Sequence, residues 1–263
     1  MAQGRGEAFD YLLGERTSAS AALAERMAAA RLLRARRPVL SVNGNVAALA
    51  AREVATLARA IPGLRVEVNL FHRSPSRARL VAETLRKAGV AGVLGEAPTA
   101  RLRGLASNRA WVDARGILRA DVVLVPLEDG DRAEALVRAG KFVISIDLNP
   151  LSRTSRSAQL PIIDELTRAL RGSRRAALRL RAGPPGAYPP LQNTEGGASF
   201  RMAALDRIRE GLDRWAARED GPGSAGSSPR DARPPTSGNA RPSRRTPPLR
   251  SRRHRSPRSP LPR

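Results

Sequence analysis

The chain has 263 residues, 41% of them hydrophobic but only 3% aromatic, and a formal net charge of +23. This length and apolar content suffice for a real core, while the absence of cysteine excludes disulfides, thiolate catalysis and the usual structural zinc sites. No stretch approaches the roughly 18 apolar residues of a membrane helix, and the N-terminus lacks the apolar part of a signal peptide, so we expect a cytoplasmic protein without a membrane partner.

The elements alternate along the chain after an N-terminal helical segment, residues 1–37. Runs of β-branched residues predict strands at 38–44, 64–71, around Val93, and at 121–127, 141–148 and 160–166. Helical spacing of apolar residues predicts helices at 45–60, 74–89 and 131–140. This alternation is typical of a parallel sheet covered on both faces, and we predict a Rossmann-like α/β domain over residues 38–170.

The C-terminal third changes character. We expect a linker at 171–199, a helix at 200–219, and a disordered tail rich in Arg, Pro and Ser at 220–263. From Gly221 onward the tail has eleven Arg and one Asp, so it could bind nucleic acid non-specifically through charge. The chain lacks the stacking aromatics of single-strand readers, and arginine is abundant throughout, so compositional bias is the favoured interpretation.

Four polar loops are predicted to meet at the carboxyl edge of the sheet, where ligands of such folds gather. They are 43–45, 69–74, 126–132 and 147–155. Their asparagines can cap helices or hold a ligand, and their arginines, Arg73, Arg132 and Arg153, suit phosphate or carboxylate groups. The carboxylates in 128–131 suit either Mg²⁺ or arginine partners, and Asp131 is also a candidate helix cap. Neither G-x-G-x-x-G after a strand nor a Walker motif is present.

Several long strings resemble the archaeal 4-phosphopantoate–beta-alanine ligase family, also called archaeal phosphopantothenate synthetase. The resemblance runs in order from Gly4 to about Ala169 and does not reach the tail. It is carried by "GRGEAFDYLLGERT" (Gly4 to Thr17), "SVNGNVAAL" (Ser41 to Leu49), "VEVNLFHRS" (Val66 to Ser74), "ADVVLVPLEDGDRAEALVRAGK" (Ala120 to Lys141) and "IDLNPLSRTS" (Ile146 to Ser155).

The resemblance implies an AMP-forming ligase of coenzyme A biosynthesis. Its in-line attack on a phosphate needs charge neutralisation and positioning more than a protein nucleophile. Such an enzyme joins (R)-4-phosphopantoate to β-alanine through an acyl adenylate, with ATP as a substrate accompanied by Mg²⁺, and works as a homodimer. The nucleotide contacts carried over from the family are Arg5, Asp147, Leu148, Asn149, Arg153, Thr154, Glu165 and Leu166. Weaker candidates for the phosphopantoate and β-alanine side are Asn43, Asn45, Asn69, Arg73, Asp129 and Arg132.

The sequence departs from the family in three ways. Relatives carry a helical segment before "GRGE" with a further nucleotide-contacting arginine, so either the start lies upstream or this chain lacks part of the site. Gln3 stands in place of His and His72 in place of Tyr, both of which keep hydrogen-bonding ability. Glu165 replaces Asn at a nucleotide contact and would repel a phosphate if its carboxylate faced one. An inactive nucleotide-binding relative is therefore the alternative.

Overall fold

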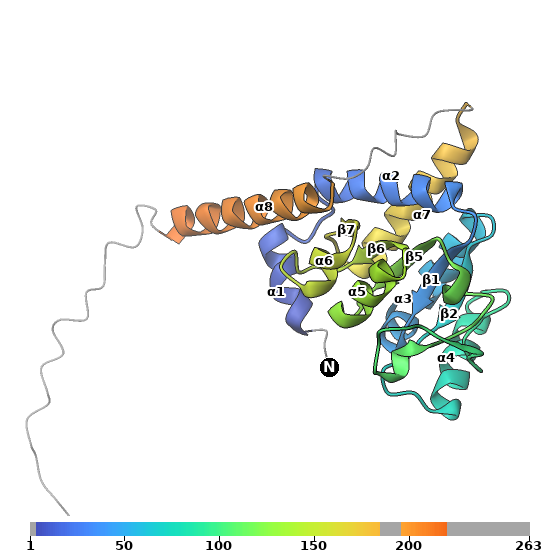
Figure 1. Cartoon of the computed structure of the whole chain (residues 1–263). Coiled ribbons are helices and arrows are strands. Elements are labelled where there is room, and N and C mark those ends of the chain that lie inside the picture. Colours follow the sequence, from blue (N-terminus) through green and yellow to red (C-terminus); the bar gives the residue numbers. More distant parts are fainter. Residues whose placement is uncertain (1–3, 185–195, 220–263) are drawn as a thin grey trace, which may run out of the picture. The chain divides into compact units, whose positions relative to one another are not determined.

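A five-stranded parallel sheet forms the centre of the computed structural model, which describes residues 4–184 and 196–219 (Figure 1). Every neighbouring pair of strands in this sheet is parallel. The predicted α/β fold with a parallel sheet is therefore confirmed. The strands lie in the spatial order β2 (Arg65–Val68), β1 (Pro38–Val42), β5 (Val122–Pro126), β6 (Phe142–Ile146) and β7 (Leu160–Ile162).

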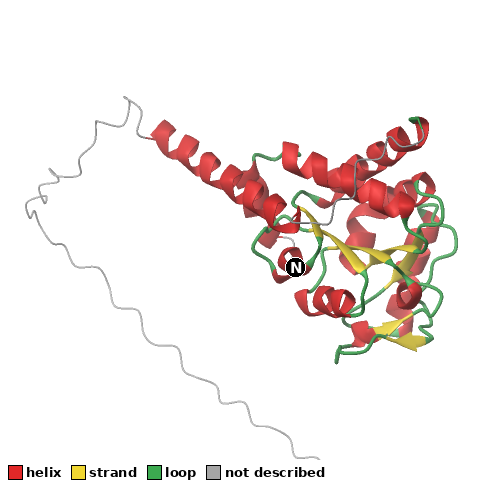
Figure 2. Cartoon of the chain, turned by 45° about the horizontal axis from the view of Figure 1, so that its top comes forward, coloured by secondary structure: helices red, strands yellow, loops and turns green. Residues whose placement is uncertain are grey.

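Both faces of the sheet are covered, as Figure 2 shows for the strands between the helices. Alternate residues of a strand point to opposite faces, so Leu40 and Leu124 belong to one apolar cluster and Val39 and Val123 to another. The first cluster receives side chains from α2 (Ala19–Arg34), α3 (Gly44–Ala60), α4 (Pro75–Lys87) and α7 (Leu166–Ala182). The second receives them from α5 (Gly130–Arg138) and from residues 102–120.

Helix starts follow the capping residues in the sequence. Asn43 caps α3 by accepting a hydrogen bond from the backbone N of Val46, and Ser74 caps α4 directly before a proline in the first turn. The alternative that Asp131 caps its helix is wrong, because α5 begins at Gly130 and places Asp131 inside the first turn. Asp129 occupies the cap position, but its side chain makes no capping bond.

The region between α4 and β5 is largely irregular. The run around Val93, expected to be a strand, contributes only an isolated bridge between Leu94 and Glu67. Further along, β3 (Ala100–Arg101) pairs antiparallel with β4 (Trp111–Val112), and two single 3₁₀ turns lie at Asn108–Ala110 and Ile117–Arg119. We call residues 95–120 the excursion.

The expected linker begins too early. Residues 171–182 continue α7, because buried Ala176 and Ala177 extend its apolar stripe past the predicted domain end at 170. The last helix, α8 (Gly196–Glu219), also begins before the expected residue 200. Residues 185–195 and the predicted tail 220–263 lie outside the described residues.

Two helices, α1 (Gly4–Leu13) and α2, form the N-terminal segment. The helix α8 contacts α1, α2, β7 and the short α6 (Arg153–Ser157), and Arg207 of α8 donates from Nε to the carbonyl of Leu13 at 3.2 Å. Among the described residues, no helix is both long and apolar enough to cross a bilayer.

Candidate active site

The strand order reverses between β1 and β5, since the chain runs outward from β1 to β2 and then returns to the other side of β1. Loops leave such a pair of strands in opposite directions and open a crevice beyond their carboxyl ends. Asn43 spans this point, because its Oδ1 accepts from Val46 N and its Nδ2 donates to the carbonyl of Leu127 at 2.8 Å. Leu127 itself has a φ of 48°, a left-handed conformation that is uncommon for a bulky residue.

A cleft of about 780 Å³ lies at this edge. It contains five of the predicted site residues, two from the substrate side and three from the nucleotide side: Asp129, Arg132, Asp147, Arg153 and Thr154. Glu128 and Asp131, two of the carboxylates considered for Mg²⁺ or arginine partners, also line it. The sequence did not single out the other lining residues, which are Phe71, Gly104, Leu105, Ala106, Ser107, Arg109, Gly130, Arg138 and Ser152. The cleft therefore joins both predicted groups in one cavity.

The loop after β6 is held by its own hydrogen bonds. Asp147 accepts from the backbone N of Asn149 at 3.0 Å and from the hydroxyl of Ser152 at 2.6 Å. Asn149 accepts from the backbone N of Leu151 at 2.8 Å, so its side chain shapes the turn. Burial raises the pKa of Asp147, and the two hydrogen bonds oppose that effect. Each oxygen of Asp147 keeps capacity for a further donor, such as a ribose hydroxyl.

The loops after β5 and β6 are joined directly. Thr154 donates its hydroxyl to the carbonyl of Glu128 at 2.7 Å. A Cβ placed on Gly130 would overlap the Cβ of Arg153, so the starts of α5 and α6 lie in van der Waals contact. Arg153 pairs with Asp131 at 2.7 Å and with Glu134 at 3.2 Å, and both partners raise its pKa. Its side chain is 58% exposed and faces the cleft, where a phosphate could approach.

Two predicted nucleotide contacts, Leu148 and Leu166, have structural duties. Leu148 packs in a small apolar cluster with Leu13, and a Cβ on Gly6 would lie 3.3 Å from its Cδ1, so α1 covers this part of the loop. Leu166 is buried in the main core. Arg5 lies in α1, but its side chain is outside the described part of the chain.

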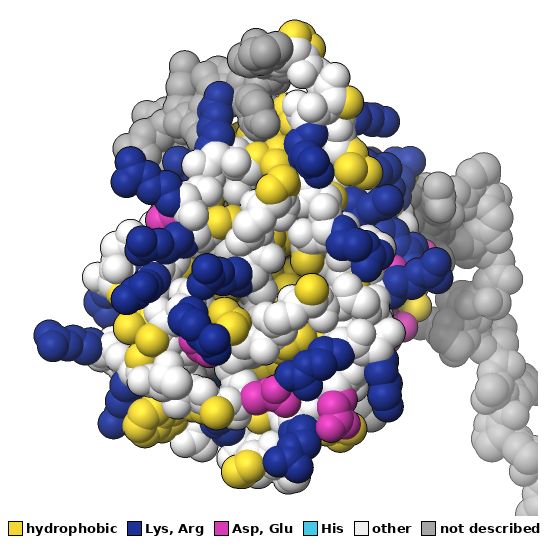
Figure 3. All heavy atoms as spheres, turned by 90° about the vertical axis from the view of Figure 1, so that its right-hand side faces the viewer, with side chains coloured by type: hydrophobic (Ala, Val, Ile, Leu, Met, Phe, Trp, Pro, Cys, Tyr) yellow, Lys and Arg dark blue, Asp and Glu magenta, His cyan; other side chains and the backbone are white. Residues whose placement is uncertain are grey.

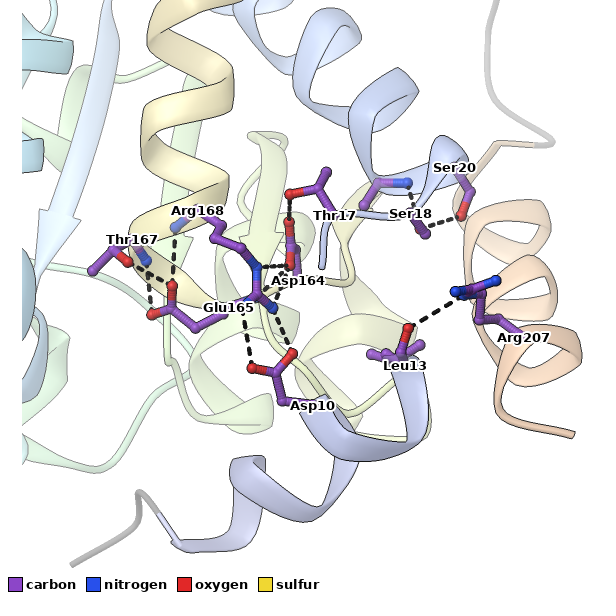
Figure 4. Close-up of polar contacts among 11 residues, drawn as sticks. Asp10, Leu13, Thr17, Ser18, Ser20, Asp164, Glu165, Thr167, Arg168 and Arg207 are labelled. Atoms are coloured by element: carbon purple, nitrogen blue, oxygen red, sulfur yellow. Dashed lines mark hydrogen bonds and ion pairs between the residues drawn. The ribbon is translucent and has the colours of Figure 1, made fainter. Parts of the chain in front are cut away.

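The carboxylate of Glu165 caps α7 (Figure 4), so its negative charge lies at the start of that helix. It accepts from the backbone N of Thr167 and of Arg168, each at 2.9 Å, and from the Thr167 hydroxyl at 2.6 Å. These bonds hold the pKa of Glu165 below its ordinary value despite burial. Glu165 thus serves as the helix cap of α7.

Asp164, next in the chain, ties the N-terminal helices to α7 (Figure 4). It accepts from the Thr17 hydroxyl at 2.6 Å and from Nε of Arg168 at 2.9 Å. Arg168 also donates to Asp10 of α1, at 3.1 Å from Nη1. Because α1 covers Leu148, this network fixes one wall beside the loop after β6.

On the opposite side, Glu128 lies between two arginines that enter from different parts of the chain. Its carboxylate pairs with Arg109 of the excursion and with Arg132 of α5, and its side chain is only 2% exposed. Burial lowers the pKa of each guanidinium to about 10, so both stay charged near neutral pH. Asp129 pairs with Arg109 at 3.2 Å. All three carboxylates of the 128–131 run thus pair with arginines, the second of the two uses expected for them.

The remaining substrate-side candidates lie away from the cleft lining. Asn69 is buried and donates from Nδ2 to the carbonyls of Arg109 and Trp111, at 3.1 and 3.0 Å. Arg73 donates to the carbonyls of Gly95 and Glu96, each at 2.6 Å. Asn69 and Arg73 therefore hold the backbone of the excursion in place. Asn43 links β1 to the loop after β5, so all three residues support the cleft without lining it. Asn45 is exposed in the first turn of α3.

Basic side chains are spread widely over the protein. The face shown in Figure 3 has Lys and Arg scattered across it, with few acidic side chains among them. No cluster of three or more His, Asp or Glu side chains among the described residues is arranged to hold a metal ion.

Comparison with known proteins gives consistent matches. The family model described as phosphopantothenate/pantothenate synthetase matches residues 20–185. A protein of Methanosarcina mazei named 4-phosphopantoate–beta-alanine ligase is 52% identical over 217 residues, 82% of this chain and 85% of the relative. Ligases of the same name from Thermococcus onnurineus and Methanospirillum hungatei are 57% and 51% identical, over 64% and 80% of this chain and 65% and 84% of the relatives.

Proposed function

Because this chain belongs to the phosphopantothenate/pantothenate synthetase family, we propose that it is a 4-phosphopantoate–beta-alanine ligase of coenzyme A biosynthesis. The observation that supports this most directly is the single cleft that holds both the nucleotide-side residues Asp147, Arg153 and Thr154 and the substrate-side residues Asp129 and Arg132. Two substrates must lie side by side for one to attack the other, and one cavity provides this.

The proposed reaction has two steps. A carboxylate oxygen of phosphopantoate attacks the α-phosphorus of ATP, the bond from that phosphorus to the pyrophosphate oxygen breaks, and an acyl adenylate forms. The β-alanine amine then attacks the acyl carbon, the bond to the AMP oxygen breaks, and the amine loses a proton. Neither step needs a protein nucleophile, so positioning and charge neutralisation are the tasks left to the chain.

The residues of the cleft suit those tasks. Arg153 offers a guanidinium to the phosphates of ATP, and the loop that Asp147 holds in shape lies where the ribose would bind. If Mg²⁺ accompanies ATP, the exposed carboxylates of Asp129 and Asp131 at the cleft would be the protein groups suited to add a ligand, beside their ion pairs with arginines, and the metal would neutralise phosphate charge. We place the enzyme in the cytoplasm because its substrates are charged metabolites.

The test is a product assay on the purified full-length chain. AMP, pyrophosphate and 4'-phosphopantothenate should appear only when ATP, 4-phosphopantoate and β-alanine are all present. Formation of ADP and phosphate would contradict the adenylate route. ATP binding without any turnover would instead identify the inactive relative. Truncation after Asp220 should leave the ligase rate unchanged, whereas polyanion binding through the tail should vanish with it and with added salt.

We also propose a homodimer. Leu212 and Trp215 of α8 and Tyr11 of α1 are large apolar or aromatic side chains that are 49%, 63% and 60% exposed, on helices that contact each other. Burial of such a surface is the usual driving force of subunit association. Sedimentation equilibrium should give twice the chain mass, and Trp215→Lys should shift the mass toward one chain. A wild-type protein of single-chain mass would refute this.

A further inference from the structure

Glu67 is a buried carboxylate that the proposed reaction does not use directly. It lies on β2, the edge strand of the sheet, is 0% exposed and does not line the cleft. A buried carboxylate is costly unless hydrogen bonds compensate for the lost water. The compensating donors belong to the excursion: Oε1 of Glu67 accepts from the backbone N of Asp113 at 2.8 Å, and Oε2 accepts from that of Ile117 at 2.6 Å. One side chain of the sheet thus binds the excursion at two points.

Two glycines of the excursion make room for this side chain. A Cβ on Gly116 would overlap the carboxylate of Glu67, and a Cβ on Gly95 would lie 2.9 Å from its Cγ. Gly95 also has a φ of 84°, a conformation that favours glycine. The two glycines stand near the two ends of the excursion, so both ends pack closely on Glu67.

Asn69 complements Glu67 two residues further along. Its backbone N donates to the carbonyl of Val42 at 2.9 Å, so it continues the pairing of β2 with β1, and its side chain lies on the same face as that of Glu67. Whereas Glu67 accepts from N–H groups of the excursion, Asn69 donates to the carbonyls of Arg109 and Trp111. The two side chains therefore anchor the backbone of the excursion at four points.

The anchored segment forms part of the cleft. Residues 104–107 and Arg109 line it, and Arg109 pairs with Glu128 and Asp129 of the loop after β5. Asp129 is one of the candidates for the acid and β-alanine side. A shift of the excursion would therefore displace the lining on that side, while the loop after β6 has its own internal hydrogen bonds.

We propose that Glu67 is a positioning residue of the ligase, which sets the place of the cleft wall at residues 104–109 by holding the backbone of the excursion. This inference rests on the proposed function and names a residue outside the cleft on which the reaction depends. A displacement of about 1 Å can cost on the order of a hundredfold in rate when two substrates must be aligned. Glutamine at position 67 has the same shape, but its NH₂ group would face one of the two backbone N–H groups.

The first experiment measures backbone hydrogen exchange in the full-length chain without ligand, at pH 8. Burial raises the pKa of Glu67 to about 7, so its carboxyl is mostly ionised there. In Glu67→Gln, peptides containing the N–H groups of Asp113 and Ile117 should exchange roughly tenfold to a hundredfold faster, because a charge-assisted bond is lost. Peptides of α7 should be unchanged. Equal acceleration everywhere, or none at these two groups, would overturn the local role.

The second experiment uses fluorescence, since the chain has only two tryptophans, Trp111 of the excursion and Trp215 of α8. In a Trp215→Phe background the emission reports on the excursion alone. Adding Glu67→Gln should move the emission to longer wavelength and increase quenching by acrylamide, because the Trp111 ring, 43% exposed in the wild type, becomes more accessible. Glu83→Gln, at an exposed position of α4, is the matched control and should change neither quantity. Identical emission in both variants would contradict the proposal.

Kinetics then test the link to the reaction. Glu67→Gln should raise KM for 4-phosphopantoate roughly tenfold and leave KM for ATP near the wild-type value, whereas a merely destabilised enzyme would lose active fraction and hence kcat alone. Glu67→Asp keeps the charge but withdraws the oxygens by one methylene, so it should act in the same direction and replaces Glu67→Gln if that variant does not fold. Equal rises in both KM values would overturn the positioning role.

Failure of this inference can be told apart from failure of the proposed function. If the chain makes no AMP, calorimetric titration of 4-phosphopantoate gives the same comparison without turnover. Weaker binding by Glu67→Gln than by the wild type and Glu83→Gln supports the role of Glu67, and equal binding by all three overturns it. The product assay decides the reaction by itself.

Discussion

The two sides of the cleft differ in how their polar groups are satisfied. On the side proposed to bind the nucleotide, Asp147, Asn149 and Thr154 all have hydrogen-bond partners within the protein. On the side that faces the proposed acid, buried Arg132 keeps Nε and Nη2 without a hydrogen-bond partner, while Arg109 is held by ion pairs with Glu128 and Asp129. A loop that satisfies itself has its shape before any ligand arrives, whereas a buried ion-pair cluster is left with an uncompensated charge when one member is lost. Substitutions on the first side should therefore affect binding, and those on the second should affect folding as well.

The largest effect is expected for Arg132→Met, which would break the buried cluster. It removes one of the two partners of Glu128 and the contact with Ser41. A buried carboxylate that loses a partner destabilises a fold by about 3–5 kcal/mol, measurable by urea denaturation. Adding Glu128→Gln should restore part of the loss, because the uncompensated charge is then gone. A single variant as stable as the wild type would show that the cluster is not tightly coupled.

Arg153→Ala sharpens the contrast from the nucleotide side. Loss of a phosphate contact should lower kcat/KM for ATP roughly tenfold to a hundredfold. The melting temperature should barely change, because the ion pairs of Arg153 with Asp131 and Glu134 are exposed. Arg156→Ala, at an exposed position of the same helix, is the control and should change neither quantity. A lower melting temperature with unchanged ATP kinetics would reverse the assignment.

Glu25 has a buried side-chain atom without a partner that lies outside the cleft, and its effect on stability should depend on pH. Its Oε1 has no partner, and Gly172 of α7 leaves just enough room for its carboxyl. Burial and then the charge of Asp164 raise the pKa of Glu25 to about 7, from an ordinary 4.5, against the opposing charges of Arg175, Arg26 and Arg168.

Because the folded state prefers the protonated form of Glu25, its contribution to stability is full below pH 4.5 and is lost as the pH rises toward 7. The loss is at most about 1.4 kcal/mol per pH unit in that window. Glu25→Gln should flatten this decline and raise the melting temperature at pH 8, with ligase activity unchanged. A variant whose stability declines with pH as steeply as the wild type would assign the dependence to other groups.

The smallest effect is expected for Glu165→Asn, which exchanges one helix cap for another. Asparagine caps helices well, so the free energy of unfolding should change by less than about 0.5 kcal/mol, whereas Glu165→Ala should lower it by about 0.5–2 kcal/mol. The KM for ATP should stay constant in Glu165→Asn, because the carboxylate is committed to the start of α7. A marked fall in that KM would mean that the carboxylate repels the nucleotide.

The strands and their edge could be predicted because each is a local pattern. Runs such as 122–126 and 142–146 are β-branched and buried on both faces, and parallel strands end at one edge wherever they stand in the sheet. The loops holding Asp147 and Arg153 followed from that rule. The full length of α7 could also have been predicted, since Ala176 and Ala177 continue its apolar spacing. The many arginines between them and the earlier apolar residues obscured this pattern.

Arg109 could not be found in this way. It lies in the excursion, where two-residue strands and single 3₁₀ turns leave no periodic pattern. Its position depends on Asn69 and Glu67, which are 40 or more residues away along the chain and bind backbone atoms. Any residue offers a backbone carbonyl or N–H, so the sequence of the excursion does not reveal such a partner. Because Asn43 and Asn69 also bind backbone atoms, the sequence could not distinguish them from ligand-binding asparagines.

The contact between Gly130 and Arg153 gives the cleft a thermodynamic property. The absence of a side chain at Gly130 lets the starts of α5 and α6 touch, and the Thr154 hydroxyl joins them again at the carbonyl of Glu128. A shift of one helix start therefore displaces the other. If bound nucleotide changes the affinity for the acid by some factor, bound acid must change the affinity for nucleotide by the same factor. We therefore expect the contact that the missing side chain of Gly130 permits to couple the two proposed binding equilibria.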